Sequence, residues 1–425
     1  MAPIDLAVSR RLLPRFDASP TPYHAVATAA RVLSEGGFEE VDPADPFPTD
    51  PGRCFLRRGG ALIAWAVHDH HDVTAGVRIV GAHTDSPNLR VKPQPDTRNG
   101  RWRQLGVEIY GGVLLNSWLD RDLGLAGRVA VRNGDEVDLR LFHDDRALLR
   151  VPQLAIHLDG DIREKGLLLD RQRHMVPVWG LGEGPTFASY LADRVGVDAD
   201  AVMAWDVMAH DLTPARLAGA DDELMVTGRI DNLLSSFLAV DALVATDPGP
   251  HIDMVALLED EEVGSVSSTG AAWSLLRDVV ERLVHGLGGD VDDRHRAMAR
   301  SMMISADGAH ATHPNYASRH EPDHLIELNA GPVLKVNGNQ RYATDADSAA
   351  AFAVACERAG VPMQRFVNRT DLACGSTIGP TTAAELGVPV VDAGCAQLAM
   401  HSARETAGSH DPAWFLAALR EFLAA

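Results

Sequence analysis

Short apolar runs recur along the chain, and each is followed closely by an acidic or histidine residue. Four such runs, with the residues that follow them, are 77–81 with His83 and Asp85, 252–258 with Glu261 and Glu262, 302–305 with Asp307, and 398–400 with His401. Apolar runs of this length are typical of buried parallel strands. Ligands gather beyond the carboxyl ends of the strands in open α/β sheets. We therefore expect all four segments to present these side chains at one end of one sheet.

The remaining patterns predict helices on either side of a β-rich stretch. Residues 91–224 consist of short alternating runs separated by Asn-Gly and Gly turns, which favours β-structure. Helical spacing is found in residues 3–37, 231–245, 270–287, 345–359 and 411–424. Residues 53–67 alternate as strands do, 68–72 (HDHHD) are expected to form a hairpin turn, and 286–293 a surface loop.

This order of patterns predicts a domain inserted into another domain. A length of 425 residues favours about two to three domains. We expect residues 1–90 and 226–425 to form one α/β domain with a mixed sheet, and residues 91–225 to form an inserted β-rich domain. Because His83 precedes the insertion and Asp231 follows it, a shared site requires the two halves to rejoin.

Charge and cysteine content narrow the functional class. The net charge of −20 disfavours nucleic acid and anionic membranes as partners. The four cysteines form no CxxC pair, which predicts free thiols in a reducing compartment, and the first residues have no secretory apolar region. No run of about 18 apolar residues is present. These features predict a cytoplasmic protein.

The acidic and histidine residues are those that a two-metal hydrolase requires. Such a site needs a bridging carboxylate, terminal ligands and a free carboxylate as base, and zinc suits a mixed imidazole and carboxylate shell. Asp231 begins a predicted helix and is the natural bridge. Glu262 can bind metal while Glu261 acts as the base. Asp85 is placed to accept the other ring N–H of His83. A lone acidic loop or histidine is usually structural, but recurrence after several strands favours a metal site.

Seven motifs resemble those of the aspartyl aminopeptidases and the related vacuolar aminopeptidases. They are AHTDSP (82–87), GRIDNL (228–233), EDEEVGS (259–265), SADGAHATHPN (305–315), LKVNGNQRYATD (334–345), CGSTIGP (374–380) and QLAMHS (397–402). The matches run nearly from end to end of the chain. The resemblance implies an α/β catalytic domain whose inserted β-rich domain builds a dimer, and dimers that assemble into a tetrahedral dodecamer.

The resemblance also implies a role for individual residues. The first metal would be held by His83, Asp231 and Asp307, and the second by Asp231, Glu262 and His401, with Glu261 as general base. The metals would be two Zn²⁺ per subunit, with Mn²⁺ or Co²⁺ as substitutes. In the family pattern, Lys335, Tyr342 and His310 lie at the substrate. His157, within AIHL (155–158), would reach the neighbouring subunit's site. Gln153 departs from the family, which carries His there, and cannot be charged.

The leading hypothesis is a metalloaminopeptidase that releases N-terminal Asp or Glu from peptides. In it, Glu261 assists the attack of a zinc-activated water on the peptide carbonyl. One alternative is a two-metal aminopeptidase or related deacylase that prefers neutral residues. The other is a catalytically silent scaffold of the same fold, which has no need of a base that binds no metal. The activity on a panel of peptides distinguishes the three.

Overall fold

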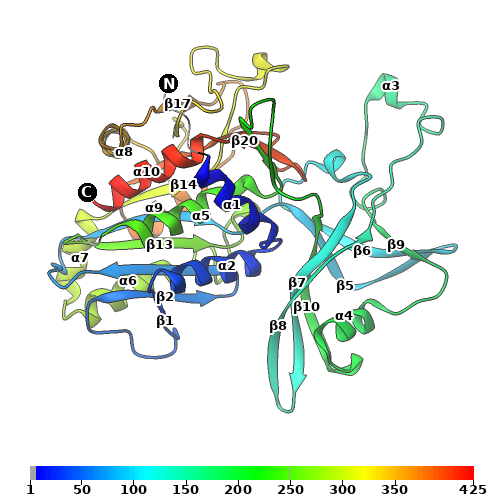
Figure 1. Cartoon of the computed structure of the whole chain (residues 1–425), viewed down its shortest axis with the longest axis horizontal. Helices are drawn as coiled ribbons and strands as arrows, with labels where there is room; N and C mark the ends of the chain where they lie inside the picture. The colour runs from blue at the N-terminus through cyan, green and yellow to red at the C-terminus, as the bar shows by residue number, and fades with distance from the viewer. Residues whose placement is uncertain (1–5, 248) are drawn as a thin grey trace. The chain divides into compact units, whose positions relative to one another are not determined.

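The structure is a computed structural model that describes residues 6–247 and 249–425, and it divides into two compact units (Figure 1). Unit 1 comprises the described residues up to Asp85, then Ala215–Met400 and Glu405–Ala425, and unit 2 comprises Ser86–Pro214 and His401–Arg404. The expected insertion, 91–225, covers most of unit 2 and also strand β11 (Arg216–Ala218), which belongs to unit 1.

A nine-stranded mixed sheet forms the centre of unit 1. In spatial order its strands are β1 (Glu39–Glu40), β2 (Gly52–Arg58), β3 (Ala61–Val67), β13 (Ile252–Leu258), β4 (Val77–His83), β14 (Met302–Ala306), β18 (Val390–Gly394), β16 (Val333–Val336) and β17 (Gln364–Val367). Strands β13, β4, β14 and β18 are parallel to one another. Three of the four apolar runs are therefore confirmed as neighbouring parallel strands, and the fold class is the expected mixed α/β.

Helices cover both faces of this sheet (Figure 1). On one face are α1 (Ala7–Asp17), α2 (Pro22–Glu35), α5 (Ile230–Ala245), α8 (Ala346–Ala359) and α10 (Asp411–Leu423), and on the other are α6 (Leu275–Gly286), α7 (Val291–Arg300) and α9 (Ile378–Leu386). Strand β13 shows why its run is continuously apolar. Val255 and Leu257 are buried in the core of the first face, and Met254 and Ala256 in that of the second.

A second sheet of unit 1 corrects one expectation. Its five strands are β11, β12 (Leu224–Thr227), β20 (Glu405–Gly408), β19 (Ala396–Leu398) and β15 (Ala309–His310). The apolar run at 398–400 was expected in the main sheet, but it begins at the last residue of β19 and so lies at the end of a strand of this second sheet. The main-sheet strand is the preceding run, β18. The chain leaves β18 at Gly394, where a Cβ atom would lie 2.0 Å from the carbonyl oxygen of Asp307. Only glycine allows this close approach.

Unit 2 is built on a six-stranded antiparallel sheet. Its strands, in spatial order, are β8 (Glu136–Leu149), β7 (Leu123–Asn133), β10 (Val202–Asp211), β5 (Asn88–Asn99), β6 (Trp102–Tyr110) and β9 (Val178–Leu181), and its helices are α3 (Ile162–Lys165) and α4 (Phe187–Val195). The expected Asn-Gly turn joins β7 to β8, where Gly134 has a φ of 63°. The expected β-rich character of this part of the chain is thus confirmed.

Other sequence expectations differ in detail. Residues 68–72 are not a hairpin turn, because β3 pairs with β2 and β13 and not with β4. Helix α7 begins within the predicted loop 286–293, where Asp290 caps it. Residues 152–158, which include AIHL, form no strand. No helix in the described part of the chain is long and apolar enough to cross a membrane.

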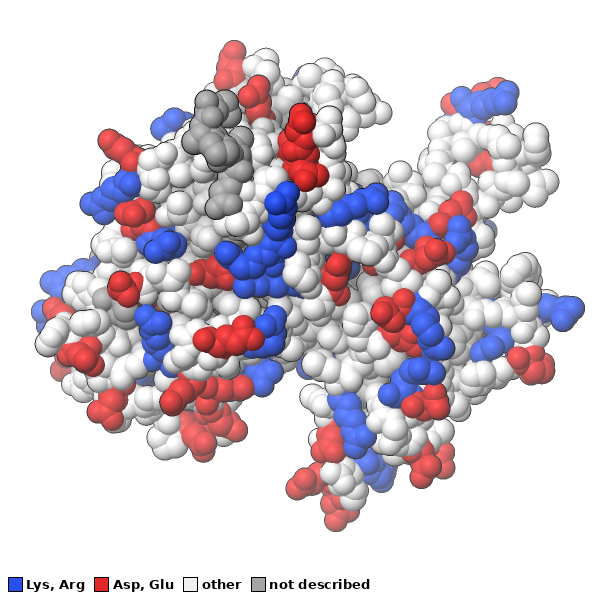
Figure 2. Space-filling model, in the orientation of Figure 1, with Lys and Arg blue, Asp and Glu red and all other residues white. Residues whose placement is uncertain are grey.

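The face shown in Figure 2 carries acidic and basic side chains close together. Among the surface charges of unit 1, Arg31 and Glu35 pair within α2 at 2.8 Å. Both of these side chains are well exposed, so the pair contributes little to stability.

Candidate metal centre

The carboxyl ends of three parallel strands bring the predicted ligands together. His83 is the last residue of β4 and is paired in register with Leu258 of β13. Glu261 and Glu262 follow β13 in a short 3-10 helix, η3 (Glu261–Val263). Asp307 follows β14. The arrangement is the one that parallel strands favour, since their carboxyl ends meet at one edge of the sheet.

Three buried side chains have the spacing of a zinc site. Nε2 of His83 lies 3.3 Å from Oδ1 of Asp231 and 3.5 Å from Oδ2 of Asp307. Zinc bonds of about 2.05 Å in a tetrahedral shell place neighbouring ligand atoms about 3.4 Å apart. Both distances match that value. His83, Asp231 and Asp307 therefore fit a zinc ion in residue type and in geometry.

Asp231 is held in place by residues from three segments of unit 1. Its backbone N–H donates to Oε2 of Glu405 at 3.0 Å. The side-chain amide of Asn232 donates to the carbonyl of Ala306 at 2.8 Å, beside Asp307. Ser236, one turn further along α5, donates from its hydroxyl to the carbonyl of His83 at 2.7 Å. The start of α5 is thereby tied to the ends of both β4 and β14.

Asp85 connects His83 to the adjacent glutamates. Nδ1 of His83 lies 3.0 Å from the backbone carbonyl oxygen of Asp85 and 3.4 Å from its Oδ1. The expected role of Asp85 is thus shared between its carbonyl and its carboxylate. The ring N–H at Nδ1 leaves Nε2 free to act as a ligand. The carboxylate of Asp85 also accepts the backbone N–H groups of Glu261 at 3.2 Å and Glu262 at 3.1 Å.

The pKa shifts of Glu261 and His83 indicate that a positive charge would stabilise this group of side chains. Burial raises the pKa of Glu261 to about 7, opposed by His83 and reinforced by the nearby aspartates. Burial acts to lower the pKa of His83, but the hydrogen bonds to Asp231 and Asp307 outweigh it and raise that pKa well above its usual range. A divalent cation among these carboxylates offsets their mutual repulsion. The charge balance thus agrees with the geometry.

His401 belongs to unit 2. Its ring Nδ1 lies 3.1 Å from the carbonyl oxygen of Gly112, and its own carbonyl accepts the N–H of Leu114 at 3.1 Å, both within unit 2. The predicted second ligand set combines it with Asp231 and Glu262 of unit 1. That set stays a prediction.

Lys335 is directed at the first metal ligand set. It lies on β16, is only 1% exposed, and its ammonium donates to Oδ1 of Asp307 at 2.9 Å and to the carbonyl of Gly308 at 3.1 Å. The ammonium also lies 5.0 Å from the ring centroid of Tyr342. This pairing makes Lys335 a direct neighbour of Asp307, a predicted metal ligand, which the sequence alone did not predict.

The other two predicted substrate residues share one aromatic neighbour. The ring centroid of Phe366, on β17, lies 6.3 Å from that of Tyr342 and 6.2 Å from that of His310. The structure therefore brings Lys335, Tyr342 and His310 together around Asp307 and Phe366. Phe366 itself was not predicted, because its short strand carries no motif.

His157 lies in an exposed turn of unit 2. The same turn exposes Leu154, Ile156 and Leu158, at 56%, 53% and 74%. His157 is itself exposed, so it is not packed in the core of the single chain. Gln153 is also exposed, and its backbone N–H donates to Asp120 at 3.2 Å.

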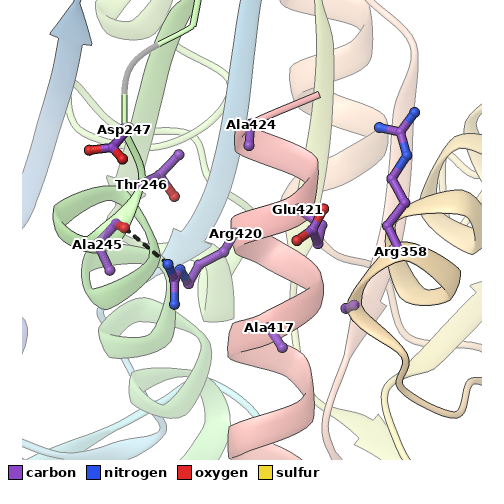
Figure 3. Close-up of a pocket in the computed structure, with 9 residues that line it drawn as sticks. Ala245, Thr246, Asp247, Arg358, Ala417, Arg420, Glu421 and Ala424 are labelled. Carbon is purple, nitrogen blue, oxygen red and sulfur yellow. Dashed lines mark hydrogen bonds between the residues drawn. The ribbon is translucent and has the colours of Figure 1, made fainter.

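One pocket of unit 1 contains none of these residues (Figure 3). It has a volume of about 380 Å³ and lies where α5 and α8 end, beside the last turns of α10. Its charged lining residues are Asp247, Arg358, Arg420 and Glu421, and Arg420 donates to the carbonyl of Ala245 at 3.2 Å. Because the charges are mixed and one is already satisfied, the pocket does not favour a particular ligand.

Comparison with known proteins agrees with the site. Residues 16–423 match the M18 family, described as aminopeptidase I zinc metalloprotease. The chain is 52% identical over 428 residues to the probable M18 family aminopeptidase 2 of Mycobacterium bovis (strain BCG / Pasteur 1173P2), with 99% of this chain and 98% of the relative covered.

Solved structures lead to the same family. One chain of the Ape4 and Nbr1 complex has a TM-score of 0.95 and 35% identity, covering 98% of this chain and 85% of that one. The S. cerevisiae mApe1 dodecamer has a TM-score of 0.87 and 26% identity, covering 98% of this chain and 96% of that one. The chain belongs to the M18 family of zinc metallo-aminopeptidases.

Proposed function

We propose that this aminopeptidase releases N-terminal aspartate and glutamate from peptides. The observation that carries the proposal is the buried ammonium of Lys335, 2.9 Å from the predicted metal ligand Asp307. A substrate side chain that enters beside this ligand meets a cation. The proposal has four parts, which are the metal ligands, the base, the acidic preference and a site shared between subunits.

Two zinc ions per subunit are proposed, the first held by His83, Asp231 and Asp307. The second is assigned to Asp231, Glu262 and His401. Zinc bound there supplies Lewis-acid chemistry, which polarises a carbonyl and makes water more acidic. The spacing of His83 from its two carboxylate neighbours supports the first assignment.

Glu261 is proposed as the general base. Its carboxylate takes a proton from water as the hydroxyl adds to the peptide carbonyl carbon. It then gives that proton to the leaving amine as the C–N bond breaks. A carboxylate that is largely buried beside the proposed metal ligands suits a group that must both accept and donate a proton. Its distance from Nε2 of His83, 3.9 Å, is longer than a tetrahedral edge, which favours a base over a ligand of the first metal.

Acidic preference is assigned to Lys335 with Tyr342 and His310. The ammonium of Lys335 has three protons, and Asp307 and Gly308 accept two of them. The third can meet a substrate carboxylate. Opposite charges about 4 Å apart in a partly dry site interact by roughly 4 kcal/mol. That gain exceeds the long-range repulsion from the net charge of −20, which salt screens within about 8 Å.

A shared site in a homo-oligomer completes the proposal. His157 is proposed to reach the active site of a neighbouring subunit within a tetrahedral dodecamer. The exposure of its turn, and the dodecamer named for the yeast relative, support this assignment. The four cysteines are free thiols, which agrees with the cytoplasmic location that we propose.

A preference for neutral residues is the second candidate. The observation in its favour is that Lys335 is only 1% exposed and already bonded to Asp307. A lysine used only to hold a metal ligand would not discriminate among side chains. The two candidates therefore differ in what the third proton of Lys335 does.

One experiment separates the candidates. The zinc-loaded enzyme is assayed on peptides that differ only in an N-terminal Asp, Glu, Leu or Ala, and zinc per subunit is measured on the same sample. We expect about two zinc ions and the highest kcat/KM for Asp and Glu. Preference for Leu would replace the acidic assignment with the neutral one.

A further inference from the structure

We propose that Asp392 is a positioning residue for the acid-selective part of the site, acting through Lys335 and the segment that carries Tyr342. The inference rests on the proposed acidic preference. Asp392 lies on β18 and belongs to no predicted ligand or substrate set. Its contacts nevertheless join the structural segments that surround the Lys335 ammonium.

The carboxylate of Asp392 is fully buried, with none of the residue exposed. The hydroxyl of Thr377 donates to Oδ1 at 2.5 Å, and the backbone N–H of Ala343 donates to Oδ2 at 2.6 Å. Ser305 of β14 is the neighbour of Asp392 in the strand register on the side away from Lys335. The two donors fix the carboxylate in position.

The strand register places Lys335 directly beside Asp392. Strand β18 lies between β14 and β16, and Asp392 is paired with Ser305 on one side and Lys335 on the other. Side chains paired in this way lie on the same face of a sheet. The ammonium of Lys335 is therefore influenced by Asp392 while it donates to Asp307. Asp307 therefore bonds the buried cation directly, and Asp392 acts on it through its charge.

The same carboxylate supports the two loops beside Tyr342. Thr377 caps α9, and a Cβ atom on Gly379 would lie 2.5 Å from Oδ2 of Asp392, so the helix start packs directly on the carboxylate. Ala343, bonded to the other oxygen, follows Tyr342 in the chain. The hydroxyl of Ser376 donates to the carbonyl of Arg341 at 3.1 Å, which joins the two loops to each other.

A gain in folding stability does not explain why Asp392 is buried. Burying a charged carboxylate is often no more stabilising than burying apolar residues of similar volume, because the charge loses its hydration. What the Asp392 carboxylate does provide is a fixed negative charge beside the strand position of Lys335. If Asp392 loses its charge, the Lys335 ammonium is drawn further toward Asp307, and its third proton is less available to a substrate carboxylate.

The test compares Asp392→Asn with Asp253→Asn, a matched control. Asp253 is a buried aspartate of the same sheet, 1% exposed, on β13 and paired with His251 at 3.0 Å. For Asp392→Asn we expect kcat/KM on an Asp-terminated peptide to fall about ten- to a hundredfold, the value of a charged hydrogen bond. The loss should appear mainly in KM, with at most a few-fold loss on an Ala-terminated peptide and unchanged zinc content. Asp253→Asn should leave the ratio of the two substrates unchanged.

A double-mutant cycle with Lys335→Met tests the route of the effect. If Asp392 acts through Lys335, the losses in selectivity are not additive, and Asp392→Asn has little further effect on the Lys335→Met enzyme. Thr377→Val, which removes one donor to Asp392, should shift selectivity in the same direction by a smaller factor. It serves as the test if Asp392→Asn fails to fold.

Three results would overturn the inference. They are an equal loss of activity on the acidic and neutral peptides, additive effects in the cycle, and unchanged selectivity in both the Asp392 and Thr377 variants. A wild-type enzyme without acidic preference is a different outcome. It refutes the proposed function itself, and the inference about Asp392 with it, before any variant is made.

Discussion

Replacing Glu261 with glutamine tests the division of roles between the two adjacent glutamates. Glutamine has the same shape but cannot accept the proton of the attacking water. The backbone bond from residue 261 to Asp85 does not involve the side chain and should persist. We therefore expect Glu261→Gln to keep its structure and its metal while losing turnover.

The expected loss follows from the role of a general base. Such a group contributes about 10²–10⁴-fold to the rate, which corresponds to roughly 2.7–5.4 kcal/mol in the activation barrier. Zinc content should hardly change, because Oε2 of Glu261 lies 3.9 Å from Nε2 of His83 and a zinc shell places ligand atoms about 3.4 Å apart. Asp231 and Asp307 meet that spacing without it.

Glu262→Gln is the matched comparison. It removes the same charge from the same short helix, η3, and its backbone is held by the same carboxylate, that of Asp85. We expect this variant to lose occupancy of the second metal, with activity that added zinc restores in part. Zinc per subunit is measured by elemental analysis, and kcat is measured on an Asp-terminated peptide at several zinc concentrations.

The structure also allows the alternative in which Glu261 is a metal ligand. His83, Glu261 and Glu262 have ligand atoms close enough together to hold an ion by themselves. If Glu261 is a ligand, both variants should lose zinc equally, and added zinc should restore both. That result would refute the assignment of Glu261 as a base that binds no metal.

Three further predictions concern specificity, assembly and stability. Lys335→Met should reduce kcat/KM for Asp-terminated peptides at least tenfold more than for Ala-terminated peptides, and an equal reduction would mean that Lys335 does not read the acidic side chain. Mixed oligomers of Glu261→Gln and His157→Ala should regain some activity, because each supplies the residue that the other lacks. Hybrids that form without activity would refute the shared site. Burial raises the pKa of Asp411 to about 6, so the stability that its protonated form contributes is present below about pH 4 and is lost as the pH rises through 6. Wild type should therefore lose about 2.4 kcal/mol relative to Asp411→Asn between pH 4 and pH 7 in urea unfolding, and a constant difference would contradict this.

The sequence predicted those strands whose apolar residues are consecutive in the chain and whose ends carry the polar residues. Strands β4, β13 and β14 are buried on both faces, so their apolar runs are continuous and the polar residues that follow are easily recognised. His401 was assigned to the wrong sheet because the apolar letters at 398–400 resemble a strand end. The chain crosses between sheets at Gly394, and no local pattern marks that crossing.

Residues that support the site were harder to find. Glu405 holds the backbone of Asp231, and Asp392 lies beside Lys335, although the partners in each pair are 174 and 57 positions apart in the sequence. Each looks like an ordinary acidic residue in its own segment. Their roles depend on strand order and register, which one sequence without its fold does not specify. The family motifs identified the candidate ligands, but not what positions them.

The strand order also determines when the metal centre can form during synthesis. Strand β4, which ends at His83, lies between β13 and β14 in its sheet. Both neighbours are made after residues Ser86–Pro214 of unit 2, and β13 begins at Ile252. At about 5–20 residues per second, the ribosome needs roughly 8–34 seconds to reach β13 after β4 emerges. All six strands of the unit 2 sheet are complete by Asp211. This sheet can therefore fold on the nascent chain while both edges of β4 are still unpaired. During that time the two edges must be kept from pairing with other chains.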